Sequence, residues 1–367
     1  MDDSGFFGDV LRRLCDERGL SVRELAKLTN HSKTVIGEWR TGAKVPDPVE
    51  AERVDALLGA GGILAAAARM PGANGSAERL AYVAAAPRTV DTAAVDALAA
   101  TLASMRRLED SIGAERLIVV TAEPLRLVDE LADEARGAIR ERVVDVAGQW
   151  EQFAGWLQAA SGRGPAARAR YARTLEHATE ARDDNLIATS LSMRGHLAWT
   201  ARQPGPVIGL SAAAAGHALS PGLRAMAAQQ EARGHALLGE AGDVERLFDA
   251  ADEQMAAAAA HPEGEPPWTY FYTPGYLRMQ RGLAYGLLGR NDDAIGELRA
   301  GLAEAGPLVA GSEFGANYKL RLAEAHLQAG DRDVAEGLIA EVRVLAASTG
   351  SASLAHEAER LERQAGS

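Results

Sequence analysis

The sequence is poor in cysteine, aromatic residues, proline and long apolar runs. Its single cysteine, Cys15, excludes an internal disulfide, and no run approaches the roughly 18 consecutive apolar residues that suggest a membrane span. The first residues, MDDSGFF, carry acidic charge where a signal peptide needs basic charge. We therefore expect a cytoplasmic protein that does not enter a membrane.

The composition favours helices. Aromatic residues make up 5% of the 367 residues and proline only 14 of them, whereas alanine, which loses least on entering a helix, is abundant. With 47% hydrophobic and 25% charged residues, the chain can bury a sizeable core and stay in solution. We expect an all-α protein of about two or three domains with almost no sheet.

The net charge of -12 argues against a chain that coats nucleic acid over its whole surface. Residues 21–44 differ from this average, because basic residues outnumber acidic ones there. The basic residues are Arg23, Lys27, Lys33, Arg40 and Lys44, and the acidic ones are Glu24 and Glu38.

Residues 1–59 predict four or five short helices. An amphipathic helix over 6–18 ends at Gly19, and Ser21 with Glu24 forms a capping box that starts a second helix reaching about Leu28. After a turn at 29–31, Ser32 caps a third helix that ends near Gly42. Asp47, Pro48 and Glu50 then open a fourth helix with an N-cap, an N1 proline and a capping acid.

Helices two and three resemble the helix-turn-helix of the XRE family of regulators, which has the lambda-repressor-like fold. Leu25-Ala26 matches the paired Leu-Ala of the family's first motif helix, and Ile36 and Trp39 match two buried positions of its recognition helix. The resemblance covers roughly residues 7–58 and implies a DNA-binding domain over 1–59. Three departures stand out: Asn30 replaces the usual turn glycine, His31 replaces a buried aliphatic residue, and Gly37 lies inside the recognition helix.

The resemblance also implies roles for single residues. By position, Lys33, Thr34 and Glu38 would face base edges in the major groove, although Lys33 could equally contact a phosphate. The residues expected at backbone phosphates are Ser21, Arg23, Ser32, Arg40 and Lys44.

Residues 60–89 are rich in Gly, Ala, Pro and Ser and predict a linker. Residues 90–136 predict connecting or dimerisation helices. Their apolar positions follow three- and four-residue steps, which favours a core-facing helix over a dimer seam because fewer than about three full heptads are present. These positions are Val95, Leu98, Leu102, Met105 and Ile112.

The C-terminal region repeats a pattern of small residues. Gly282, Tyr285, Gly289 and Ala294 form one unit, and residues 322–335 form a second, 41 residues further on between Gly289 and Gly330. These offsets resemble the tetratricopeptide repeat, in which small residues let two antiparallel helices touch. With weaker turn signals upstream, they predict a tetratricopeptide-like α-solenoid over residues 137–367.

Catalytic motifs are weak or incomplete. Residues 37–44 lack the lysine and the preceding strand of a phosphate loop, and the scattered histidines form no zinc motif. We therefore expect no catalytic residue, metal or cofactor, and a protein that is not an enzyme.

One loop concentrates aromatic residues. Residues 266–276 hold five aromatic rings, which either form the wall of a ligand pocket or fill the junction where a long loop crosses the helical stack. The residues expected to contact a ligand, from this loop and the inner faces of the two best repeats, are Trp268, Tyr270, Tyr276, Met279, Asn317, Leu320, Glu324 and Gln328.

Together these features predict a dimeric transcriptional regulator that binds a double-stranded DNA operator. Its repeat domain would sense a small-molecule, peptide or protein effector on a concave face. The alternative is a repeat scaffold that binds a partner protein and never touches DNA, which the acidic total mildly supports.

Overall fold

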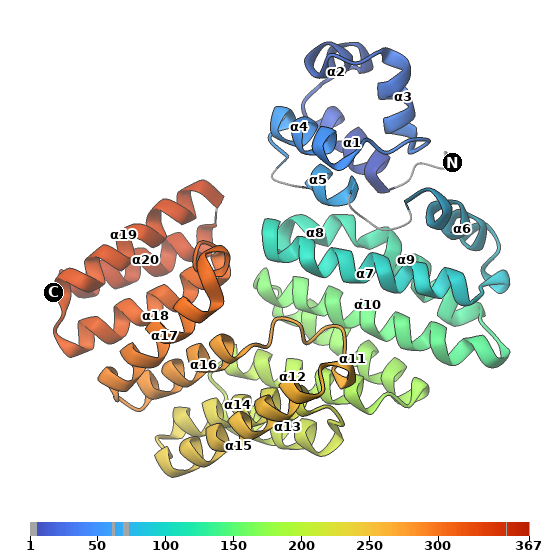
Figure 1. The fold of residues 1–367 in the computed structure, drawn as a ribbon. Helices are drawn as coiled ribbons and strands as arrows, with labels where there is room; N and C mark the ends of the chain where they lie inside the picture. The colour runs from blue at the N-terminus through green and yellow to red at the C-terminus, as the bar shows by residue number, and fades with distance from the viewer. Residues whose placement is uncertain (1–5, 61–62, 69–72, 350, 367) are drawn as a thin grey trace. The chain divides into compact units, whose positions relative to one another are not determined.

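The computed structural model describes residues 6–60, 63–68, 73–349 and 351–366 (Figure 1). Throughout these ranges the regular elements are all helices, so the predicted all-α fold is confirmed. None of the described helices combines the length and the apolar character needed to span a membrane. The chain divides into two compact units, Met1–Arg182 and Asp183–Ser367.

The first unit begins with five short helices. In chain order they are α1 (Phe6–Glu17), α2 (Val22–Thr29), α3 (Lys33–Thr41), α4 (Pro48–Leu58) and α5 (Ile63–Ala68). The elements that follow are α6 (Ala73–Ala85), the 3-10 turn η1 (Pro87–Thr89), α7 (Thr92–Ile112), α8 (Ala114–Val120), α9 (Ala122–Glu134), the 3-10 turn η2 (Gly137–Ile139), α10 (Arg140–Ala160) and α11 (Gly164–Ala181).

Local capping sets the ends of the N-terminal helices. Both hydrogen bonds of the predicted Ser21–Glu24 capping box are present at the start of α2. Asn30 ends α2 in the left-handed conformation at φ 57°, which asparagine tolerates better than most residues. Ser32 caps α3, and Asp47 caps α4 ahead of Pro48, as predicted.

The segment 60–89 differs from the expected linker. It contains α5 and α6, although residues 61–62 and 69–72 lie outside the described residues. The Asp55 carboxylate accepts hydrogen bonds from the backbone N–H of Leu64 at 2.7 Å and of Ala65 at 3.3 Å, and Leu64 is fully buried. Since α5 packs against α1 and α4, the N-terminal domain extends beyond residue 59.

Helices α7 to α11 belong to the first unit. The predicted apolar row on α7 is buried in the same hydrophobic cluster as Trp150 and Phe153 of α10, so the chain itself covers the face considered as a dimer seam. Because α10 packs against α7, α8, α9 and α11, the first helix pair of the expected 137–367 domain is part of this unit instead. The single cysteine, Cys15, lies fully buried in this cluster.

The second unit is a series of helix pairs. The helices are α12 (Asp184–Thr200), α13 (Pro204–His217), α14 (Pro221–Leu238), α15 (Ala241–Ala260), α16 (Pro274–Leu287), α17 (Asn291–Ala310), α18 (Glu313–Ala329), α19 (Arg332–Thr349) and α20 (Ala352–Ala365), with the 3-10 turn η3 (Pro262–Gly264) after α15. The first helices of successive pairs, α12, α14, α16 and α18, pack against one another (Figure 1).

Small residues bring α16 and α17 into close contact. A Cβ atom on Gly282 would lie 2.9 Å from the Leu298 backbone nitrogen, and one on Gly301 would lie 2.7 Å from the Gly275 carbonyl oxygen. The structure therefore has no room for a side chain at either position. This close approach is what the spacing of small residues around Gly282 predicts.

Candidate nucleic-acid interface

Helix α3 has one buried and one exposed side. The Ser32 hydroxyl accepts a hydrogen bond from the Val35 N–H at 3.2 Å and starts the helix. Ile36 and Trp39 are buried, with exposed fractions of 0% and 5%, as the sequence pattern predicts. Lys33 and Thr34 follow the cap and are exposed, so the first turn of α3 presents polar side chains outward.

Contact with α1 holds the end of α3. A Cβ atom on Gly8 would lie 2.8 Å from both the Arg40 carbonyl oxygen and the Gly42 nitrogen, so only glycine fits this crossing. The Arg12 guanidinium donates to the Arg40 carbonyl at 3.1 Å. These contacts fix α3 through its backbone and leave its outward side chains uninvolved.

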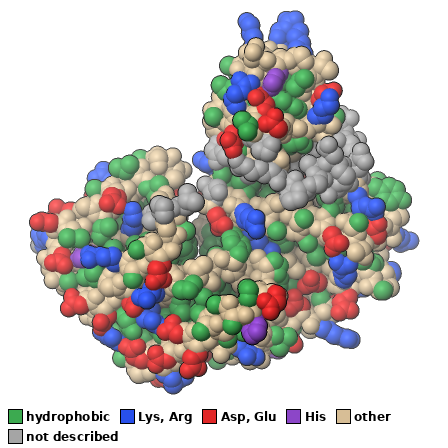
Figure 2. Space-filling model, in the orientation of Figure 1, with side chains coloured by type: hydrophobic (Ala, Val, Ile, Leu, Met, Phe, Trp, Pro, Cys, Tyr) green, Lys and Arg blue, Asp and Glu red, His purple; other side chains and the backbone are tan. Residues whose placement is uncertain are grey.

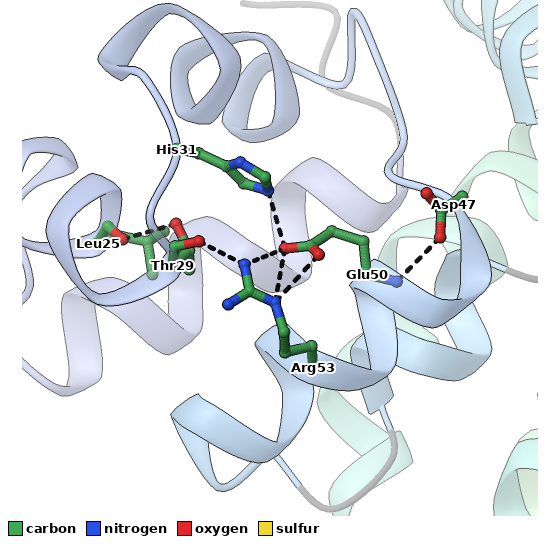
Figure 3. A network of polar contacts seen from close by, with 6 residues as sticks. All are labelled: Leu25, Thr29, His31, Asp47, Glu50 and Arg53. Carbon is green, nitrogen blue, oxygen red and sulfur yellow. Dashed lines mark hydrogen bonds and ion pairs between the residues drawn. The ribbon is translucent and has the colours of Figure 1, made fainter.

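His31 joins the turn between α2 and α3 to helix α4 (Figure 3). Its ring meets the Trp39 ring edge to face, with centroids 4.7 Å apart, and its Nε2 lies 2.8 Å from the Glu50 carboxylate. Arg53 pairs with Glu50 and donates to the Thr29 carbonyl oxygen. His31 therefore packs against Trp39 and pairs with Glu50 at the same time.

This network makes the stability of the N-terminal helices depend on pH. The Arg53 hydrogen bond, followed by that of His31, holds the pKa of Glu50 below its ordinary value against the effect of burial. A carboxyl group whose pKa is lower in the folded protein than in the unfolded chain stabilises the fold at pH values above the unfolded-state pKa. This stabilisation is lost as the pH falls through the folded-state pKa. Glu50→Gln should therefore cost about 1 kcal/mol at pH 7, and progressively less as the pH is lowered through the folded-state pKa of Glu50.

Hydrogen exchange of α2 to α4, measured across this pH range, checks the expectation. Glu253→Gln on α15 provides the control, since Glu253 is an exposed glutamate of the other unit. A loss of stability in Glu50→Gln that does not decrease as the pH is lowered would contradict the assigned role of the carboxylate.

The structure pairs several of the residues predicted to contact DNA. The Lys44 ammonium lies 2.9 Å from the Glu38 carboxylate, so each partly neutralises the other. The Arg40 guanidinium lies 3.5 Å from Asp16 and is directed toward α1. Ser21 and Ser32 use their hydroxyls as caps, and Arg23 is exposed. Their contacts with DNA stay predictions.

The surface around α2 and α3 carries basic groups. Figure 2 shows Lys and Arg side chains projecting at the top of the view, where Figure 1 places α2 and α3. Apart from its own helix backbone, no described residue has an atom within 4 Å of a Cβ atom built on Gly37. The outer side of α3 is therefore open around this glycine.

The eight residues predicted to contact a ligand fall into different environments. Met279 and Leu320 are 1% and 0% exposed within hydrophobic clusters, so they line no open surface. Trp268 is also buried and donates to the Thr189 hydroxyl at 2.9 Å. The structure leaves Tyr276 and Glu324 partly exposed, and the more exposed residues are Tyr270, Asn317 and Gln328.

One group among the described residues has the composition of a metal site. Ligand atoms of His235, Glu240 and Asp243 lie within 4.8 Å of one another at the turn between α14 and α15. The His235 Nδ1 already lies 2.5 Å from Glu240, and Asp243 accepts from Arg246 at 2.8 Å. These internal pairs account for the arrangement without an ion.

Comparison with known families gives a match to the N-terminal part of the chain. Residues 7–68 match the family described as a helix-turn-helix domain, a range that includes α5 as well as α1 to α4. No curated protein matches the chain significantly. The helix-turn-helix domain suggests a DNA-binding regulator and DNA as its partner.

Proposed function

We propose that the protein is a sequence-specific transcriptional regulator that places α3 in the major groove of its operator. The observation that carries the proposal is the first turn of α3, where exposed Lys33 and Thr34 follow the Ser32 cap while Ile36 and Trp39 anchor the opposite side. An N-terminal recognition turn with this orientation can reach base edges. Lys33 would donate to guanine, and Glu38 would accept from cytosine.

Phosphate contacts would orient α3 without reading sequence. Arg23 is exposed beside the N-terminus of α2, and Lys44 lies in the loop after α3. The Lys44–Glu38 ion pair suggests that the two side chains separate or reorient at the DNA. The net charge of -12 restricts non-specific attraction, so binding would depend on this surface.

We further propose that the helix pairs form a tetratricopeptide-like sensor. The close glycine crossings of α16 and α17 and the stacking of α12, α14, α16 and α18 support this assignment. The protein would act in the cytoplasm as a homodimer on half-sites about 34 Å apart. It would act by binding an effector rather than by catalysis.

DNA selected from a random duplex pool by the full-length protein tests the proposal. On the selected site, the logarithm of affinity should fall linearly with that of salt, each phosphate contact adding about 0.9 to the slope. Lys33→Ala should weaken binding by about 10- to 100-fold, because one good base contact is worth about 1–3 kcal/mol. Fluorescence anisotropy with the labelled duplex measures both effects.

Arg116→Ala is the matched control, because Arg116 is an exposed basic residue of α8 outside the helix-turn-helix domain. It should leave affinity unchanged. Failure to enrich any sequence, with no retarded DNA even at low salt, would contradict the proposal and favour the protein-binding scaffold. Equal affinity of Lys33→Ala and wild type would remove Lys33 from the interface.

A further inference from the structure

The second unit buries an arginine without a carboxylate partner among the described residues. Arg233 of α14 is 4% exposed. Its Nη1 donates to the Gln280 side-chain oxygen at 3.0 Å, and its Nη2 donates to that of Gln230 at 2.9 Å. The buried Nε has no hydrogen-bond partner, and the guanidinium carbon lies 4.7 Å from the centroid of the Trp199 ring.

This arrangement is costly in the absence of a ligand. Amide oxygens solvate a guanidinium only partly, and a buried charge normally needs an opposite charge. Arg281 on the neighbouring helix α16 shows the usual solution, because it pairs with Asp252 at 2.6 Å. For Arg233, burial lowers the pKa of the guanidinium, with only tyrosines acting in the opposite direction.

The polar groups that lie around Arg233 in the described part of the chain include tyrosine hydroxyls, glutamine amides and a histidine. The Tyr272 hydroxyl is buried without a hydrogen-bond partner. The Gln280 amide nitrogen donates to the Tyr318 hydroxyl at 2.5 Å. Burial, and after it the nearby Arg233 charge, lowers the pKa of His196 to about 3, so this histidine is neutral.

Aromatic rings form a continuous wall beside these donors. Tyr276 stacks on Phe314 with centroids 5.7 Å apart and lies 5.2 Å from the ring of Tyr272. Tyr318 meets Phe314 at 5.1 Å, and Phe271 meets Tyr276 at 5.6 Å. Phe314 is 38% exposed, so the wall runs from the buried arginine to the surface.

We propose that the cluster of Arg233, Tyr272, Tyr276, Gln280, Phe314 and Tyr318 binds a small molecule that carries a carboxylate on an aromatic body. The carboxylate would accept hydrogen bonds from the Arg233 Nε–H and the Tyr272 O–H, supplying the missing negative charge. The aromatic body would insert between the rings of the wall. The assignment of this molecule as the effector rests on the regulatory function proposed above.

Ligand entry involves the connection between α15 and α16. Tyr272 lies in this loop and is 7% exposed, so it must move before a carboxylate reaches Arg233. Trp268, in the same loop, is anchored to Thr189 of α12. Binding would therefore change the contacts of the α15–α16 loop, which Trp268 attaches to α12, and this gives the ligand a means of altering the helix stack.

The thermal midpoint of the full-length protein, measured with arylcarboxylates and their neutral amides, tests this site. The probes are benzoate, 3-phenylpropionate and indole-3-acetate, each paired with its primary amide. At about 100-fold above its Kd, a carboxylate that binds should raise the midpoint by about 5–10 °C, whereas its amide should not. Calorimetric titration then gives the Kd.

Two variants separate a ligand site from a structural arginine. Tyr272→Phe removes a hydroxyl without a partner, so it should fold normally and bind about 10-fold more weakly. Arg233→Met should change the midpoint without ligand only slightly, because it removes a buried charge but also the donor to the Gln230 and Gln280 oxygens, and these two effects oppose each other. It should also abolish the carboxylate shift.

Arg281→Met is the matched control, because it removes a partly buried arginine that has a carboxylate partner; the ligand shift should persist. The proposal is overturned if no probe gives a carboxylate-specific shift, if the shift survives in Arg233→Met, or if that variant unfolds without ligand. None of these measurements uses DNA, so their failure is distinguishable from failure of the DNA-binding proposal.

Discussion

Replacement of Trp39 by alanine is expected to lower the free energy of unfolding of the N-terminal helices by about 3–5 kcal/mol. The indole is 5% exposed, and its removal would leave a cavity between α3 and the rest of the domain. The edge-to-face contact with His31 would also be lost. Hydrogen exchange of α1 to α4 measures the change without interference from the other helices, and DNA binding should fall with it.

Leu28→Ala on α2 is the control for this variant, because Leu28 is 49% exposed. Its effect should be below about 0.5 kcal/mol. If α3 in Trp39→Ala were protected from hydrogen exchange as well as in the wild type, this would contradict the burial of the Trp39 ring. It would also contradict the outward orientation of Lys33 and Thr34.

Gly8→Ala is expected to destabilise the same domain by about 2–3 kcal/mol, although it adds a single methyl group. The new Cβ would lie 2.8 Å from backbone atoms of Arg40 and Gly42, and backbone cannot give way as a side-chain end can. Helix α1 would have to move away from the end of α3. Hydrogen exchange of α1 and α3 reports the loss, and the affinity for selected DNA should fall in parallel.

Gly37→Ala is the matched substitution with the opposite expected sign. Its Cβ meets nothing within 4 Å, and alanine in a helix interior is favoured over glycine by about 0.5–1 kcal/mol. The free protein should therefore become more stable. Destabilisation by Gly37→Ala, or stabilisation by Gly8→Ala, would contradict the crossing of α1 and α3 described above.

The parts of the fold that depend on residues close together in the chain could be predicted from the sequence. The Ser21–Glu24 box, the left-handed Asn30 and the caps of α3 and α4 are local, so their residue types suffice. Helix α5 was missed because a carboxylate nine residues upstream, Asp55, caps it within a Gly- and Ala-rich stretch. The spacing on α7 correctly favoured a core-facing helix, but it could not show that α10 covers this face, because that depends on packing between distant segments.

In the candidate site too, features set by neighbouring residues could be predicted, and features set by distant residues could not. The resemblance to helix-turn-helix regulators implied that Lys33 and Thr34 point outward, and both side chains are exposed. The pairing of His31 with Glu50 was missed because 19 residues separate them, although the Glu50–Arg53 spacing and the unusual histidine were visible signals. Burial of Arg233 without an acid could not be inferred, because it depends on several helices that assemble around it.

The fully buried Cys15 gives the N-terminal domain a built-in chemical reporter. Burial raises the pKa of its thiol, and alkylating reagents attack the thiolate. Since the chain has one cysteine, labelling of the native protein with a maleimide would be slow. Its rate would report local unfolding of the N-terminal domain alone. Occupancy of an operator, by suppressing those openings, would then slow the labelling in proportion.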